Sequence, residues 1–244
     1  MKKRLDVLLV EKKLSETITK AQALIMTGRV IVDDKISDKP GLLIDVSADV
    51  SVVKKYPYVS RGASKLEKAF QEFNLDFNDK TLCDIGSSTG GFTDFALQHG
   101  AKRIYAVDVG RGQLDQKLRE DERVVVMEKT DFRNVHELPD EVNYFLCDVS
   151  FIGLRQILPH ILELAAKGKQ QKTNIIALIK PQFEAETKEV SRGKGVIKSE
   201  QLRLEIVNEI KKFAQNLGFE IRGLTESPIL GAKGNKEYLI HLSY

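Results

Sequence analysis

The sequence has no tryptophan, only two cysteines and no long hydrophobic run. A helix needs roughly 20 consecutive apolar residues to cross a bilayer, so we expect no membrane-spanning segment. The chain starts with MKKRLDVLLVEKKL, in which Asp6 interrupts a short apolar run and no small-residue cleavage site follows, so we predict no signal peptide. These absences predict a cytoplasmic protein that makes no use of a membrane.

Neither cysteine has a metal-ligand partner at short spacing. Cys83 and Cys147 lie inside apolar runs, and the four histidines are scattered singly along the chain. Zinc sites in proteins use cysteine or histidine pairs that lie close in the sequence. We therefore expect two buried core cysteines and no metal site.

The net charge of +3 is concentrated in the first quarter of the chain. Residues 1–60 carry 11 Lys and Arg against 8 Asp and Glu, whereas residues 61–244 carry 27 of each sign. A basic module attached to a neutral one suits a polyanionic partner such as a nucleic acid. The alternative is a set of solvated surface lysines with no partner.

The pattern of the chain predicts two domains. We predict a small α+β module over residues 1–55, a linker over 56–63 in KKYPYVSRG, and a larger domain over 64–244. The module reads as helices over residues 4–11 and 19–26, followed by strands at RVIVDDKI and DVSVV. So short a segment buries little surface, which is typical of a satellite module.

The larger domain alternates between strands and helices. Apolar strands are predicted at TLCDIG, RIYAVDV, RVVVME, YFLCDVSF and NIIALIK, and helices are predicted after Gly91, at 113–118, 154–166 and 200–216. Two further strands, FEIRGLTESPI and KEYLIHLSY, have no helix between them and predict a closing antiparallel hairpin. The whole indicates an α/β, doubly wound, Rossmann-like sheet with helices on both faces.

A glycine-rich turn between the first predicted strand and its helix indicates a nucleoside-binding site. Glycines there let the backbone approach a ligand closely, and an acid after each of the next two strands is placed to bind a ribose and an adenine amino group. A nicotinamide dinucleotide and S-adenosylmethionine compete at this point, but the loop reads GxSxGG instead of GxGxxG and no hydride-transfer site follows. The candidate cofactor-binding residues are Asp84, Gly86, Ser88, Gly90, Gly91, Phe92, Asp108 and Asp131.

Two charged residues follow the fourth and fifth predicted strands. Asp148 and Lys180 both fall at the carboxyl edge of the sheet, where α/β proteins bind their ligands. A lysine that ends a run as apolar as NIIALI is costly to bury unless it is paired or functional, and partial burial favours a neutral amine that can act as a base. A purely structural ion pair between Asp148 and Lys180 is the alternative.

These residues carry a family resemblance. The order Lys65, Asp148, Lys180 and Glu237 resembles the Lys-Asp-Lys-Glu tetrad of the FtsJ-like ribose 2′-O-methyltransferases. From end to end, segments such as YVSRGASKLEKAF, DIGSSTGGFTD, CDVSFI, LIKPQFE and SRGKGV resemble the TlyA family, whose members often carry the name haemolysin. The resemblance implies an N-terminal RNA-binding domain of the ribosomal-protein-S-four type, S-adenosylmethionine as methyl donor, and ribosomal RNA or a ribosomal subunit as partner, with cytidine 2′-hydroxyls as acceptors.

The resemblance also implies roles for charged residues. Lys180 would act as the general base, Asp148 would position it, and Lys65 and Glu237 would orient the acceptor hydroxyl, with no metal required. The segment EAETKEVSRGKGVIKSE is either a lid that grips the RNA backbone or a disordered solvated loop. The candidate RNA-binding residues are Lys3, Arg4, Lys20, Arg29, Arg61, Arg192, Lys194 and Lys198.

Two departures from the family pattern stand in the first quarter of the chain. Thr17-Ile18 replaces the Ser-Arg that such RNA-binding modules carry, so Lys20 or Arg29 would have to supply the phosphate contact. The linker reads Tyr56-Pro57-Tyr58-Val59, where some relatives have Arg-x-Trp-Val. A non-catalytic RNA- or ribosome-binding protein and a haemolysin are the competing functional hypotheses.

Overall fold

The computed structural model describes residues 2–26, 29–33, 35–53, 57–167, 172–185 and 187–244. The chain divides into two compact units, one up to Pro57 and the other from Tyr58 onward. Tyr56, the first residue of the predicted linker, lies outside the described residues. None of the described helices is long and apolar enough to cross a membrane.

The first unit combines two helices with two small sheets. Strand β1 pairs antiparallel with β4, and β2 pairs antiparallel with both β3 and β5. The elements are β1 (Lys2–Arg4), α1 (Leu5–Glu11), α2 (Ile18–Met26), β2 (Val30–Val32), β3 (Lys35–Ser37), β4 (Leu43–Asp45) and β5 (Val50–Val52). Its small core is made by Leu5, Leu8, Leu9, Ala21, Ile25, Val30, Ile44 and Val50.

The prediction of one strand at RVIVDDKI was wrong. This stretch forms two strands, β2 and β3, that pair antiparallel, with Val30 opposite Ser37. The chain reverses after Val32, where Asp33 adopts a left-handed backbone with φ 45°. Aspartate tolerates this conformation better than most residues, so Asp33 marks a turn and not the middle of a strand.

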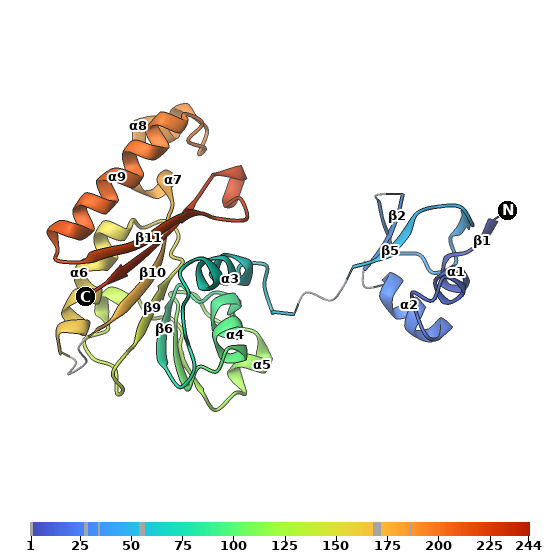
Figure 1. Ribbon diagram of the computed structural model, residues 1–244, viewed down its shortest axis with the longest axis horizontal. Coiled ribbons are helices and arrows are strands. Elements are labelled where there is room, and N and C mark those ends of the chain that lie inside the picture. The colour runs from blue at the N-terminus through green and yellow to red at the C-terminus, as the bar shows by residue number, and fades with distance from the viewer. Residues whose placement is uncertain (1, 27–28, 34, 54–56, 168–171, 186) are drawn as a thin grey trace. The chain divides into compact units, whose positions relative to one another are not determined.

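The second unit is a seven-stranded α/β sheet (Figure 1). Its strands are β6 (Thr81–Ile85), β7 (Arg103–Val107), β8 (Val124–Met127), β9 (Tyr144–Cys147), β10 (Asn174–Ile179), β11 (Glu220–Glu226) and β12 (Tyr238–Ser243). Its helices are α3 (Ala63–Glu72), α4 (Gly91–Gln98), α5 (Gln116–Arg119), α6 (Leu154–Lys167), α7 (Pro181–Glu184), α8 (Thr187–Arg192) and α9 (Glu200–Asn216), with short 3₁₀ turns η1 (Phe132–Asn134) and η2 (Ala232–Gly234).

The strand order is β11-β12-β10-β9-β6-β7-β8. Strands β8, β7, β6, β9 and β10 run parallel, while β12 pairs antiparallel with both β10 and β11. The predicted doubly wound sheet and its closing hairpin are therefore confirmed. The second strand of the hairpin inserts between β10 and β11, and all six residues of β12 are buried.

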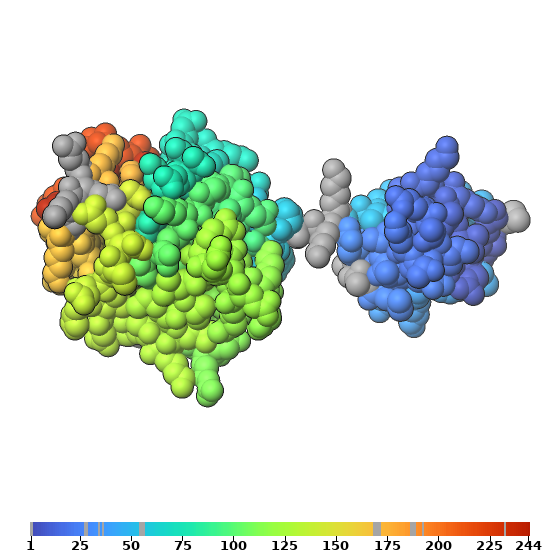
Figure 2. Space-filling model, turned by 90° about the horizontal axis from the view of Figure 1, so that it is seen from below, coloured from blue at the N-terminus to red at the C-terminus, as the bar shows by residue number. Residues whose placement is uncertain are grey.

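Helices cover both faces of the sheet because its central strands are apolar on both sides. Alternate residues of β6 belong to different cores: Cys83 and Ile85 pack with α6 and α9, whereas Leu82 packs with α3, α4 and α5. Helices α3 and α4 lie side by side on the second face (Figures 1 and 2). Both cysteines, Cys83 and Cys147, are buried in the first core, as predicted.

The sheet reverses its winding between β6 and β9. Strand β7 follows β6 on one side, and β9 pairs with β6 on the other. Ligands of open α/β sheets bind at the carboxyl ends of the strands beside such a reversal. The fold therefore places a ligand site where β6, β9 and β10 end.

We predict that Asp6→Ala destabilises the first unit. Asp6 is fully buried and accepts hydrogen bonds from Arg4, from Gln22 and from the amide of Val7. Asp6→Ala removes these hydrogen bonds, each of which contributes about 0.5–1.5 kcal/mol to stability. Hydrogen–deuterium exchange of the full chain should show faster exchange over α1 and α2, with the larger domain unchanged, and unchanged exchange over α1 would contradict this.

The same carboxylate predicts a pH dependence. The hydrogen bond from Arg4 is the main cause that lowers the pKa of Asp6 to about 2. A folded-state pKa below the unfolded value of roughly 3.9 contributes stability that is present above that value and is lost as the pH falls toward 2. Protection of α1 should thus weaken below about pH 4 in the wild type, and this loss should be absent from Asp6→Ala.

Candidate active site

The four residues of the predicted tetrad come from four different elements. Lys65 lies on α3, Asp148 directly follows β9, Lys180 directly follows β10, and Glu237 directly precedes β12. Strands β9 and β10 are parallel neighbours, so the residues after them leave the sheet at the same edge. Because β12 runs antiparallel to β10, its beginning also lies at this edge.

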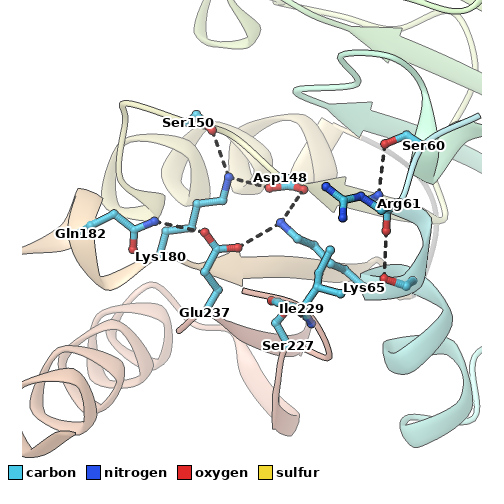
Figure 3. A network of polar contacts seen from close by, with 12 residues as sticks. Ser60, Arg61, Lys65, Asp148, Ser150, Lys180, Gln182, Ser227, Ile229 and Glu237 are labelled. Atoms are coloured by element: carbon cyan, nitrogen blue, oxygen red, sulfur yellow. Dashed lines mark hydrogen bonds and ion pairs between the residues drawn. The ribbon is translucent and has the colours of Figure 1, made fainter. Parts of the chain in front are cut away.

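The structure brings these four side chains into one chain of contacts (Figure 3). The ammonium of Lys180 lies 2.6 Å from Oδ1 of Asp148, and Oδ2 of Asp148 lies 3.2 Å from Nζ of Lys65. Lys65 in turn lies 3.0 Å from Oε2 of Glu237. Positive and negative groups therefore alternate along the tetrad, and the predicted ion pair of Asp148 with Lys180 is one part of a larger network.

Burial and charge act against each other on this network. Burial lowers the pKa of Lys65, but Asp148 and Glu237 raise it more, so that it ends above its usual value. Burial raises the pKa of Asp148, while Lys180 and Lys65 lower it to below its usual value. The network thus favours a protonated Lys65 and an ionised Asp148.

Two polar residues that we did not predict complete the network. Ser150 accepts a hydrogen bond from Lys180 at 3.1 Å, and Gln182 donates to Oε1 of Glu237 at 3.1 Å. Each stands two positions beyond a tetrad member that ends a strand. Polar residues just after neighbouring parallel strands are the signal that would have found them.

The tetrad opens into a cavity of about 270 Å³ beside the glycine-rich turn. Gly86 has φ 81°, and a Cβ there would lie 2.9 Å from the carbonyl oxygen of Asp148, so only glycine fits between the two strand ends. Of the predicted cofactor-binding residues, this cavity is lined by Asp84, Gly86, Ser88, Gly91 and Phe92.

A buried carboxylate forms part of the wall of this cavity. Asp84 accepts hydrogen bonds through Oδ2 from the amide and the hydroxyl of Thr93, at 3.0 and 2.7 Å. Its other oxygen, Oδ1, is buried and has no hydrogen-bond partner among the described residues. Burial is the main cause that raises the pKa of Asp84 to about 7, so a cationic ligand group nearby would favour its ionised form.

A second cavity, of about 490 Å³, adjoins the first. Gly86, Ser88 and Asp148 line both. Two further predicted acids, Asp108 and Asp131, line the second cavity, as do the apolar side chains of Val107, Phe132 and Ile157. A glycine turn, two acids and apolar walls are the features that a nucleoside requires.

Each of these acids already has protein partners. Asp108 accepts hydrogen bonds from the amides of Ser88 at 2.8 Å and Gly110 at 2.7 Å, which leaves further lone pairs on both oxygens. Asp131 is the N-cap of η1, and Arg133 lies 2.6 Å from its Oδ2. That hydrogen bond from Arg133 lowers the pKa of Asp131.

Gly90 is not among the residues that line the two cavities. It is the N-cap of α4 with φ 95°, and a Cβ there would lie 2.3 Å from Leu118 and 2.8 Å from Leu114. Gly90 therefore allows the start of α4 to pack closely against Leu118 of α5 and against Leu114.

The predicted RNA-binding residues of the first unit already make local contacts. Lys3 lies 2.7 Å from Glu11, Arg4 lies 2.6 Å from Asp6, and Lys20 pairs with Glu16. Arg29 donates to the carbonyl of Val53 at 3.1 Å. In each ion pair the basic side chain is at least partly exposed, so an RNA phosphate can compete with the carboxylate for it.

The predicted lid contains a helix, α8, so a disordered loop over its whole length is wrong. Its later part is tied down by Asn235, which donates to the carbonyl of Gly195 at 2.9 Å and accepts from the amide of Ile197 at 3.1 Å. Lys194 and Lys198 are exposed on this segment, while the side chain of Arg192 lies outside the described residues. Arg61, within the predicted linker, is also exposed.

Two family models match the chain. The model of the FtsJ-like methyltransferases matches residues 58–244, and that of the S4 domain matches residues 3–50. Together they account for both compact units.

Named relatives cover nearly the whole chain. The 16S/23S rRNA (cytidine-2′-O)-methyltransferase TlyA of Mycobacterium tuberculosis is 37% identical and matches 98% of this chain and 89% of its own. Hemolysin A of Brachyspira hyodysenteriae is 43% identical, with 98% of each chain covered. A solved structure of a candidate hemolysin from Streptococcus thermophilus is 41% identical, with a TM-score of 0.75 over 99% of this chain and 88% of that one.

We predict that Asp84→Asn changes how stability depends on pH. A folded-state pKa of about 7, above the unfolded value of roughly 3.9, means that the folded protein binds more protons between these values. Stability therefore falls as the pH rises from about 4 to 7, and an amide, which does not ionise, removes that loss. Thermal unfolding of both proteins between pH 4 and 8 tests this, and parallel curves would contradict it.

Proposed function

The chain belongs to the TlyA family of FtsJ-like methyltransferases and carries an S4 domain, and from this premise we propose that it methylates a ribose 2′-hydroxyl of ribosomal RNA, that of a cytidine, with S-adenosylmethionine as donor. The observation that carries the proposal is the buried Lys65-Asp148-Lys180-Glu237 network beside a nucleoside-sized cavity. The name of the M. tuberculosis relative supports the acceptor.

The residues present fit S-adenosylmethionine. When bound, this cofactor supplies a methyl group on a positively charged sulfonium. The unpaired Oδ1 of Asp84 suits the ammonium group of the methionine part of the cofactor. Gly86 leaves room for a ligand to approach the backbone closely. Asp108 and Asp131 would hold the ribose and the adenine in the second cavity.

The tetrad prepares the acceptor. A 2′-hydroxyl is a poor nucleophile until it loses its proton, and we assign the role of proton acceptor to Nζ of Lys180, which must first release its own proton to solvent and accept in its neutral form. Asp148 holds that nitrogen from one side and Ser150 from another, which fixes its direction toward the cavity. Lys65 and Glu237 would orient the hydroxyl, since the pair is rigid and buried.

RNA would reach this site through cations on both units. The S4 domain carries Lys3, Arg4, Lys20 and Arg29, and the larger domain carries the exposed Arg61, Lys194 and Lys198. Phosphate contacts of this kind are independent of sequence and give the complex a strong salt dependence. An enzyme with this substrate works in the cytoplasm, where ribosomal RNA is assembled into subunits.

We predict that Asp108→Ala weakens S-adenosylmethionine binding by more than about 1.5 kcal/mol, because hydrogen bonds to charged groups contribute roughly 1.5–3 kcal/mol. Titration calorimetry measures the change. Glu205→Ala, which removes an exposed carboxylate on α9, is the control and should bind the donor normally. An unchanged affinity of Asp108→Ala for the donor would contradict the proposed contact between Asp108 and the ribose.

The test of the function itself is a pair of substitutions at Lys180. Lys180→Ala removes the proposed proton acceptor, so single-turnover transfer to ribosomal RNA should fall by roughly 10²–10⁴-fold while donor affinity is retained. Lys180→Arg should be equally inactive, because a guanidinium stays protonated.

A purely structural Lys180 predicts the opposite. Arginine would then preserve the charge beside Asp148 and restore activity, whereas alanine would leave Asp148 with Lys65 alone and destabilise the fold by about 1.5–3 kcal/mol, the contribution of a hydrogen bond to a charged group. Thermal melting of both variants, measured beside the transfer rate, separates the cases. An active Lys180→Arg enzyme would overturn the assignment.

A further inference from the structure

Gln182 is a buried amide at the end of the catalytic network. It is 8% exposed and lies in the first turn of α7, two residues after Lys180. Its Nε2 donates to Oε1 of Glu237 at 3.1 Å, and its side chain points toward Glu237 in Figure 3. Gln182 also lines the cavity into which the tetrad opens.

The orientation of this amide is fixed by its neighbour. A carboxylate paired with Lys65 offers only acceptors, so the nitrogen of Gln182 must face Glu237. Its oxygen, Oε1, is then left buried without a hydrogen-bond partner in the described part of the chain. An unpaired buried carbonyl costs stability, and an apolar side chain of this size would avoid that cost. The bond to Glu237 is therefore what a glutamine provides here.

Glu237 is confined on three sides. Oε2 lies 3.0 Å from Lys65, Oε1 lies 3.1 Å from Gln182, and a Cβ on Gly231 would lie 1.9 Å from Oε1. Lys65 alone fixes one oxygen and leaves the carboxylate free to turn about that contact. The second hydrogen bond, from Gln182, removes this freedom.

Resting on the proposed function, we propose that Gln182 is a positioning residue for methyl transfer, which holds Glu237 against Lys65 so that the alternating charges of the tetrad keep their order when the acceptor ribose enters. Gln182 acts through Glu237 and takes no proton itself. Losing it should slow transfer without weakening the binding of the methyl donor, because the acids proposed to bind the donor belong to other elements: Asp84 lies on β6 and Asp108 directly follows β7, whereas Gln182 lies on α7 and donates to Glu237.

The first test is Gln182→Met, which keeps the length of the side chain and removes the hydrogen bond. Single-turnover transfer to ribosomal RNA should slow by about tenfold or more, the factor expected for one hydrogen bond to a charged group. S-adenosylmethionine affinity should stay within about twofold of the wild type. Gln201→Met, at an exposed glutamine on α9, is the matched control and should transfer normally.

The second test is Gln182→Glu. If Gln182 has only a structural role, the transfer rate of this variant relative to the wild type should not depend on pH. The new carboxyl faces Glu237 and shares the cavity with Lys65, Lys180 and Asp148. When ionised it repels Glu237, and when protonated it can donate a hydrogen bond to Glu237 as the amide does. A carboxylate beside another has a raised pKa, so protonation begins well above the usual range.

The ratio of the Gln182→Glu rate to the wild-type rate should therefore rise as the pH falls from about 8 to 6. A ratio that stays flat, or a Gln182→Met enzyme within about twofold of wild type, would overturn the positioning role. Parallel losses of donor affinity and melting temperature in Gln182→Met would also overturn it in favour of a structural role. A wild-type enzyme that leaves ribosomal RNA unmethylated would instead remove the proposed function, and this inference with it.

Discussion

Three buried charged side chains and the partly buried Asp148 lie at one edge of one sheet, and the rest of the site depends on how their charges are ordered. Lys65, Lys180 and Glu237 are each less than one tenth exposed. A single unpaired ion in such surroundings costs several kcal/mol, but each of these groups has a neighbour of opposite sign. The alternation makes the burial tolerable, and it also means that removing Asp148 would leave Lys180, and removing Lys65 would leave Glu237, without an oppositely charged neighbour in the tetrad.

The sheet supplies this order through its topology. Strands β6, β9 and β10 run parallel and end at one edge, while the antiparallel β12 begins there, so residues 65, 148, 180 and 237 meet although they are far apart in the sequence. Gly86 lets the turn after β6 approach the backbone of Asp148, which joins the nucleoside cavity to the catalytic one. The proposed donor and acceptor sites are therefore adjacent, and a short distance between reacting groups is itself a large part of catalysis.

Hydrophobic periodicity predicted the α/β sheet and the position of each of its strands, because buried parallel strands are continuous apolar runs. Spacing and family resemblance together predicted the tetrad. The sequence did not predict Ser150 and Gln182, since their roles depend on side-chain directions in turns beyond the strand ends. Nor does strand periodicity reveal that Gly90 packs against α5, or that Arg133 already occupies Asp131, because such contacts join elements whose relative placement only the folded chain defines.

The network assembled at this edge is proposed to deliver a methyl group to a ribose oxygen of ribosomal RNA. Mapping 2′-O-methyl groups in ribosomal RNA from cells with and without the protein tests it most directly, by resistance of the methylated position to alkaline cleavage and by mass spectrometry of the nucleosides. At least one 2′-O-methylcytidine should be present only when the protein is present. Identical maps in the two strains, or a protein-dependent methyl group on a base instead of a ribose, would contradict it.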